Sequence, residues 1–138
     1  MAMPRFICIL LLLSAARWCC AQEALVVVAA SGVPRIDQTI LQRVYTGRAQ
    51  AIGDQTVTPV HLPAGNALRQ QFLEQFLGQN EEQYTGYWLV RRYVGKGAPP
   101  REFPSVEEAL RFIGSTPGAL GYVPLSKVPP GANVIFRR

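Results

Sequence analysis

A short turn in the middle of the sequence has the residue types of an anion-binding loop. Residues 63–66 read PAGN, and apolar residues at helical spacing follow from Leu68 to Phe76. A glycine-containing turn that opens onto a helix leaves backbone N–H groups free and points them, with the positive end of the helix dipole, at one spot. The turn therefore predicts either a site for a small anion or an ordinary helix start with Asn66 as its N-cap.

Residue types for catalysis are sparse in this chain. His61 is the only histidine, so we expect neither a histidine-based triad nor a two-histidine metal site within one chain. On a short strand before a turn, it is better explained as a structural residue. The acidic pairs at residues 81–82 and 107–108 fall in first helical turns, where they complement the helix dipole. We therefore predict no catalytic residue, no metal, no cofactor and no enzymatic activity.

The segment from Tyr84 to Lys96 mixes aromatic and basic residues, which is also the composition of a surface that stacks on nucleic-acid bases. At helical spacing, Tyr84, Tyr87 and Trp88 occupy neighbouring turns of one helix, so we interpret them as core residues. The net charge of +5 falls short of a strong basic footprint. We expect no nucleic-acid partner.

The N-terminus has the layout of a secretory signal peptide. A basic residue, Arg5, precedes a short apolar run from Phe6 to Leu13, and small residues follow up to Ala21. The run is too short to span a bilayer. We predict that residues 1–21 are a signal peptide and that residues 22–138 form one mature periplasmic domain.

Cleavage after Ala21 removes all three cysteines, Cys8, Cys19 and Cys20, and lowers the net charge from +5 to +3. The mature protein then relies on neither a disulfide nor a thiol site, and a single packed core must stabilise it. The mild positive charge favours small anions or acidic partners without requiring them.

Strands that alternate with helices predict an α/β fold. The segments Ala24–Val28, Val57–Leu62 and Ala119–Val123 are short runs of mainly apolar or β-branched residues and should be neighbouring strands of one small mixed sheet. Pro59 suggests an edge strand or an irregular strand start. A last apolar stretch, Asn133–Phe136, is expected at the sheet edge. Helices are expected after the capping residues Asp37 and Asn80, from about Asn66 to Leu77, and over Val106–Ile113 with Ser105 as its cap.

Four segments in order resemble the phosphate-type periplasmic substrate-binding proteins. Residues 41–48 (LQRVYTGR) are similar to a helix-ending element of that family, and residues 57–72 to its strand, phosphate loop and helix. Residues 87–97 contain Tyr-Trp and Gly-Lys-Gly, similar to a W…GKG element, and residues 116–123 (TPGALGYV) are close to the family's TPGAIGYV. The resemblance implies a single lobe of the type 2 periplasmic-binding-protein kind, a PBP-like domain.

The loop itself departs from the family pattern. Family members hold phosphate between two lobes, and this chain has room for about one. The family loop reads RSDGSGT. Aligning its first glycine with Gly65 puts its arginine on Leu62, its serine on Asn66, its second glycine on Ala67 and its threonine on Leu68. Gly65 alone carries over unchanged, so the family's charged anchor and hydroxyl groups are absent.

An oxyanion at this loop would contact the N–H groups of residues 66–68 and the Asn66 side chain. Arg69 lies one turn into the helix and offers a charge, and Ser31 follows a strand, where α/β sheets place their ligands. The predicted ligand-binding residues are Ser31, Gly65, Asn66, Ala67, Leu68 and Arg69.

The resemblance implies an exported, non-enzymatic binding protein related to phosphate uptake, with a small oxyanion such as phosphate as its ligand. Its partner would be an ABC transporter permease or another envelope protein. The alternative is an envelope structural or protein-interaction module that kept the lobe and lost the ligand. A homodimer is a further expectation, because a single lobe leaves the anion half exposed unless a second copy covers it.

Overall fold

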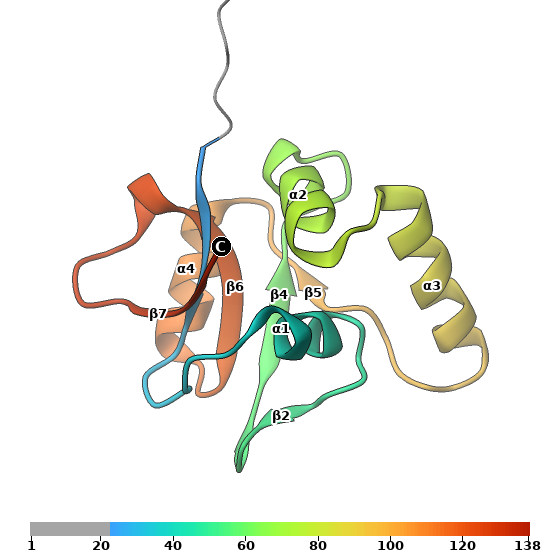
Figure 1. The fold of residues 1–138 in the computed structure, drawn as a ribbon, viewed down its shortest axis with the longest axis horizontal. Helices are drawn as coiled ribbons and strands as arrows, with labels where there is room; N and C mark the ends of the chain where they lie inside the picture. The colour runs from blue at the N-terminus through green and yellow to red at the C-terminus, as the bar shows by residue number, and fades with distance from the viewer. Residues whose placement is uncertain (1–22) are drawn as a thin grey trace, which may run out of the picture.

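The structure is a computed structural model and describes residues 23–138 (Figure 1). The predicted signal peptide, residues 1–21, lies outside the described residues. The strands are β1 (Leu25–Ala29), β2 (Ala51–Ile52), β3 (Gln55–Thr56), β4 (Thr58–His61), β5 (Arg101–Glu102), β6 (Ala119–Pro124) and β7 (Asn133–Arg137). The helices are α1 (Gln38–Tyr45), α2 (Ala67–Phe72), the π-helical η1 (Leu73–Leu77), α3 (Glu81–Tyr93), α4 (Val106–Ser115) and the 3₁₀ turn η2 (Leu125–Lys127).

A five-stranded mixed sheet in the order β5-β4-β6-β1-β7 forms the centre of the molecule. β4 pairs in parallel with β5 and β6, whereas β1 pairs antiparallel with β6 and β7. The three strands expected to be neighbours, β4, β6 and β1, are adjacent, and β7 lies at the sheet edge as predicted. All five residues of β1 are buried, as expected for an apolar run covered on both faces.

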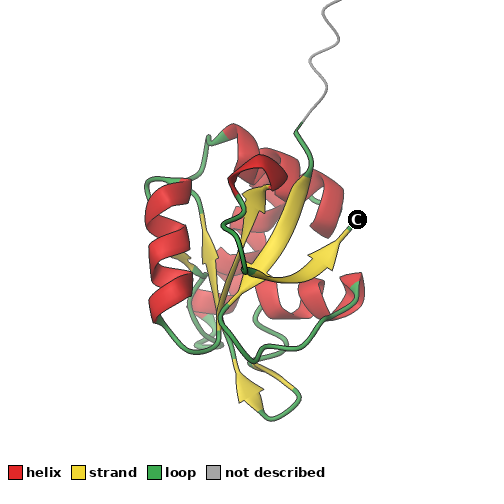
Figure 2. Cartoon of the chain, turned by 90° about the vertical axis from the view of Figure 1, so that its left-hand side faces the viewer, coloured by secondary structure: helices red, strands yellow, loops and turns green. Residues whose placement is uncertain are grey.

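Helices cover both faces of the sheet (Figures 1 and 2). Successive side chains of a strand point to opposite faces of the sheet, so neighbouring residues of β6 contact helices on different faces. Tyr122 stacks on Phe72 of α2, with ring centroids 4.1 Å apart. A Cβ at the preceding Gly121 would lie 3.0 Å from the side chain of Ile113 in α4. The α/β fold expected from the sequence is therefore confirmed.

Helix ends follow the predicted caps. The side chains of Asp37, Asn80 and Ser105 each accept a hydrogen bond from the first turn of the helix that follows. Asn80 and Gln83 form a reciprocal capping box, with bonds of 2.8 and 3.0 Å. Gly78 ends η1 in the left-handed conformation, with φ of 65°. These local signals position α2 and α3, the two helices beside the loop.

Three details differ from the sequence prediction. Residues 51–56 form a small hairpin, β2–β3, which lies outside the strands predicted from the sequence. The strand β5 was missed, because two residues carry no periodic pattern. β4 is an interior strand, so of the two alternatives predicted from Pro59 the edge strand is wrong, and Pro59 instead lies at the strand start, as the second residue of β4. Pro59 is tolerated because β5 pairs with β4 only at Val60 and His61, one residue further on.

No helix within residues 23–138 is both long enough and apolar enough to cross a bilayer.

Candidate functional site

The predicted anion loop is a capped helix start. The Asn66 side-chain oxygen accepts hydrogen bonds from the N–H groups of Leu68 (2.9 Å) and Arg69 (3.3 Å). The Asn66 N–H donates to the carbonyl of Pro63 at 3.0 Å. Of the three N–H groups predicted to bind an anion, two are therefore engaged within the chain, and that of Ala67 is left.

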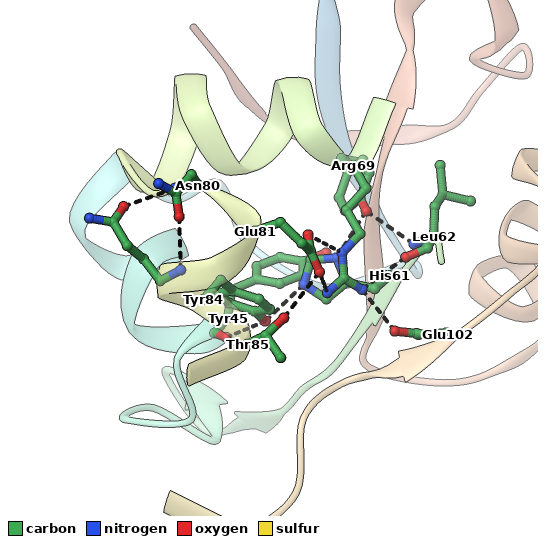
Figure 3. Close-up of polar contacts among 11 residues, drawn as sticks. Tyr45, His61, Leu62, Arg69, Asn80, Glu81, Tyr84, Thr85 and Glu102 are labelled. Atoms are coloured by element: carbon green, nitrogen blue, oxygen red, sulfur yellow. Dashed lines mark hydrogen bonds and ion pairs between the residues drawn. The ribbon is translucent and has the colours of Figure 1, made fainter. Parts of the chain in front are cut away.

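Arg69 does not point its charge at the loop. Its guanidinium donates to both carboxylate oxygens of Glu81, at 3.0 and 2.7 Å, in a bidentate pair (Figure 3). The same group donates to Glu102 at 2.8 Å and to the carbonyl of Leu62 at 3.1 Å. Arg69 is only 5 % exposed. Its positive charge is thus buried and balanced by two carboxylates from two other elements.

The electrostatics of this cluster favour a fixed ion pair. Burial acts to lower the pKa of Arg69, but the hydrogen bond and charge of Glu81, aided by Glu102, outweigh it and raise that pKa. One cation between two carboxylates leaves a local excess of negative charge. Glu74 and Glu82 line a second hollow around Gly65, together with Glu81. The surroundings of the loop are therefore acidic, which opposes anion binding.

His61 lies beneath this cluster in a directional chain of hydrogen bonds. The Leu62 N–H donates to the Tyr122 hydroxyl at 3.0 Å, which lies 2.9 Å from His61 Nδ1. On the other side, His61 Nε2 lies 2.8 Å from the Tyr84 hydroxyl, which donates to the carbonyl of Tyr45 at 2.9 Å. Because each hydroxyl has one proton to give, Nδ1 accepts and Nε2–H donates. A neutral imidazole satisfies every group, and His61 is a structural residue.

Acid should destabilise the fold through His61. Burial, and secondly the charge of Arg69, lower the pKa of His61 well below its ordinary value. The folded protein therefore keeps His61 neutral, while the unfolded chain takes up a proton below about pH 6.5. The free energy of unfolding should be intact above that pH and fall below it by up to about 1.4 kcal/mol per pH unit.

Urea unfolding at pH 7 and at about pH 5.5 checks this dependence, since few carboxylates titrate in that window. The control is His61→Gln, which is less stable at every pH but lacks the titrating ring. The variant should lose the pH slope, and an equal slope in both proteins would contradict the assignment to His61.

Ser31 lies at the opposite end of the strands from the other predicted residues. The Ala30 N–H donates to the carbonyl of Ala119 at 2.8 Å, and Ala119 pairs with Thr58 at the start of β4. The loop at Gly65 follows the end of β4 instead. The rule that ligands gather at carboxyl ends holds for parallel strands, and β1 runs against β4. The structure therefore brings residues 65–69 together and leaves Ser31 apart.

A hollow of about 250 Å³ opens on the outer side of the ion cluster, between α3 and the segment before β5. Arg69, Glu81 and Glu102 line its inner end, while Trp88 and Leu89 line its α3 side. Sequence reasoning missed this grouping. Glu81 was explained by the helix dipole alone, and no sequence signal marked Glu102, because its place depends on β5. Among the described residues, no group of three His, Cys, Asp or Glu is arranged to hold a metal.

The residues that carried the family resemblance have packing roles. Gly47 has φ of 71°, and a Cβ there would lie 2.5 Å from Cη2 of Trp88. Gly47, just after α1, and Trp88 of α3 therefore contact each other. The indole ring packs where any side chain at position 47 would lie. Lys96, between two glycines, is exposed in the turn after α3. These matches specify a fold rather than a ligand.

Solved structures with a similar fold include proteins of phosphate transport. An ABC-type phosphate transport receptor from Vibrio cholerae superimposes with a TM-score of 0.63 at 19 % identity, over 82 % of this chain and 45 % of that protein. A protein described as a phosphate ABC transporter substrate-binding protein, from Clostridium perfringens and solved with bound phosphate, gives 0.64 at 15 % identity over 82 % and 44 %. PstS from Borrelia burgdorferi gives 0.62 at 15 % identity over 82 % and 46 %.

The resemblance to phosphate-type substrate-binding proteins is therefore confirmed for the fold, which is that of a periplasmic-binding-protein lobe. This chain spans less than half the length of each of the three proteins. No protein-family model matches the chain, and no curated protein matches it. At identities below 20 %, the likeness extends to the fold alone.

Proposed function

We propose that this protein is an exported, non-enzymatic binding module with the lobe of a phosphate receptor, and that its partner is another protein of the cell envelope. The observation that carries the proposal is the state of Arg69. The cationic side chain of Arg69, one turn into the helix that follows the loop, is buried and neutralised by Glu81 and Glu102. A charge held in this way is not available to strengthen the binding of a free oxyanion.

Electrostatic magnitudes support a protein partner over an anion. Two like unit charges 4 Å apart repel by about 4 kcal/mol at an effective dielectric constant of about 20. A phosphate at the loop would meet the carboxylates that line the hollow around Gly65, those of Glu74, Glu81 and Glu82, with the Ala67 N–H as the donor left to offset them. Export is part of the proposal. N-terminal sequencing of the protein from a periplasmic fraction tests it, and the expected first residue is Gln22.

Calorimetric titration of residues 22–138 with phosphate and sulfate tests the choice of partner. We expect no binding up to about millimolar anion, since a neutral N–H alone contributes about 1 kcal/mol. The matched variant is Asn66→Asp, which keeps the cap but adds a negative charge to the loop. Micromolar binding by the wild type that Asn66→Asp abolishes would overturn the proposal.

A second candidate function is capture of an oxyanion at the same loop. The Clostridium perfringens protein of similar fold, whose structure holds phosphate, favours it. In this candidate the ligands are Gly65, Asn66, Ala67 and Leu68, with charge from Arg69. Asn66 must then release the Leu68 N–H to the anion. An ABC permease would be the partner, and the titration above distinguishes the two functions.

A further inference from the structure

Exposed apolar residues form a stripe along one helix, α3. Five large hydrophobic residues of the described chain are exposed, and four of them lie at the C-terminal end of α3. Leu89 is 68 % exposed, Val90 63 %, Tyr93 91 % and Val94 55 %. Exposed apolar residues scattered singly need no explanation, but a contiguous group marks an interaction surface.

The stripe has the spacing of a helix–helix seam. Gly86, Leu89, Val90 and Tyr93 stand at positions i, i+3, i+4 and i+7, which form one face of an α-helix. Tyr84 and Trp88, on the opposite face, are buried in the core. A Cβ at Gly86 would meet no atom within 4 Å, so this glycine leaves an open notch on the exposed face. Figure 1 places α3 at the outer edge of the fold, where another helix can approach it.

Charge is distributed along α3 with opposite signs at its two ends. Glu82 stands one turn before Gly86 on the same face, and it is exposed. Arg92 and Lys96 are exposed at the other end of the stripe. None of the three forms a salt bridge with any other residue between 23 and 138. A second copy of α3 packed antiparallel to the first is complementary to this pattern. The basic end of each helix then lies beside the acidic end of the other, and the two helix dipoles point in opposite directions.

We propose that two copies of this protein associate through α3, packed antiparallel about a twofold axis that passes between Leu89 and Val90. In this register each Leu89 lies opposite Val90 of the other copy. Each Tyr93 packs onto the notch at Gly86 of the other copy, and each Lys96 approaches its Glu82. A twofold interface uses the same patch on both copies, and this stripe is complementary to itself in both shape and charge.

Tyr93 is the anchor of this interface. A tyrosine that is nine-tenths exposed buries a large apolar area on association at low conformational cost, and aromatic residues of this kind dominate interface energies. Leu89 and Val90, which follow Gly86 by three and four residues, are exposed on the same face of α3, so the ring has an apolar surface on which to pack. The inference rests on the proposed function and names a second copy of the chain as one partner of that module.

Sedimentation equilibrium of residues 22–138, at about 10 μM to 1 mM protein, tests the dimer. We expect a concentration-dependent dimer, and Tyr93→Glu should raise its Kd about 30-fold or more. The fold should be unaffected, because Tyr93 is exposed. Leu125→Glu is the matched control: Leu125 is 43 % exposed on η2, away from the stripe, and this variant should dimerise as the wild type does.

Charge reversal tests the register. Glu82→Lys and Lys96→Glu should each weaken the dimer about 5- to 10-fold, and the double variant should recover the wild-type Kd. A monomer at every concentration overturns the proposal, as does a dimer that Tyr93→Glu leaves intact. A double variant no better than the single ones overturns the antiparallel register. These outcomes are independent of the anion titration. A titration result that contradicts the proposed function concerns the loop at Gly65 and leaves the dimer through α3 untouched.

Discussion

Gly118→Ala should destabilise the fold by about 2–5 kcal/mol, a large part of the 5–15 kcal/mol that a domain of this size has. Gly118 lies in the turn before β6 with φ of 77°, a conformation that costs an alanine about 1–2 kcal/mol. A Cβ at this position would also overlap the backbone carbonyl oxygen of Thr56. Backbone cannot move aside as a side chain does, so overpacking adds about 1–3 kcal/mol.

Gly53→Ala is the matched control for this substitution. Gly53 has a similar φ of 62°, but a Cβ there would meet no atom within 4 Å. The control should therefore show the backbone strain alone, a loss of about 1–2 kcal/mol. Urea unfolding of both variants measures the difference. If both variants lost the same free energy of unfolding, the contact between the turn and β3 would not be what excludes a side chain at position 118.

This contact explains why the segment TPGALGYV resembles a phosphate-receptor family although the loop chemistry has changed. Gly118 lets the turn pack on β3, Gly121 lets α4 pack on the sheet, and Tyr122 holds His61. None of these roles needs an oxyanion. The resemblance therefore follows the residues that build the lobe, and the absence of the family's arginine and hydroxyl groups at the loop is compatible with an intact fold.

Local signals in the sequence predicted most of the fold. The capping residues Asp37, Asn80 and Ser105 each bond to a backbone N–H group three residues further along the chain. Their types and positions therefore suffice to locate three helix starts. β1 and β6 were recognisable because their apolar runs are long and covered on both faces. The type of each main element and the neighbours in the sheet follow from such patterns and from the general rules of α/β packing.

The candidate site depended on contacts that no local pattern contains. Arg69 meets Glu81 twelve residues away and Glu102 thirty-three residues away. The second contact exists only because the two-residue strand β5 pairs with the end of β4. Ser31 was misplaced for a related reason, since strand direction is decided by long-range pairing. The sequence alone identified Arg69 as a positive charge near the loop. It did not show that the Arg69 guanidinium forms ion pairs with two carboxylates.

Tyr122→Phe should cost about 2–5 kcal/mol, because the lost hydroxyl serves two buried groups at once. Without it, the Leu62 N–H and His61 Nδ1 both lose their partner. Each buried polar group left unpaired costs about 1–3 kcal/mol. The ring itself still fits, since phenylalanine keeps the stacking on Phe72. The loss therefore reports the hydrogen bonds rather than a cavity.

Tyr87→Phe is the matched control for the hydroxyl. Its hydroxyl makes a single 2.7 Å bond, to the carbonyl of Thr46, at a half-buried position that water can reach. Its removal should cost about 1 kcal/mol or less. Urea unfolding compares the two variants. Because the hydroxyl of Tyr122 also fixes the imidazole tautomer, Tyr122→Phe should change the pH dependence of stability, whereas Tyr87→Phe should leave it unaltered. A small and pH-independent loss in Tyr122→Phe would contradict the hydrogen-bonded chain through His61.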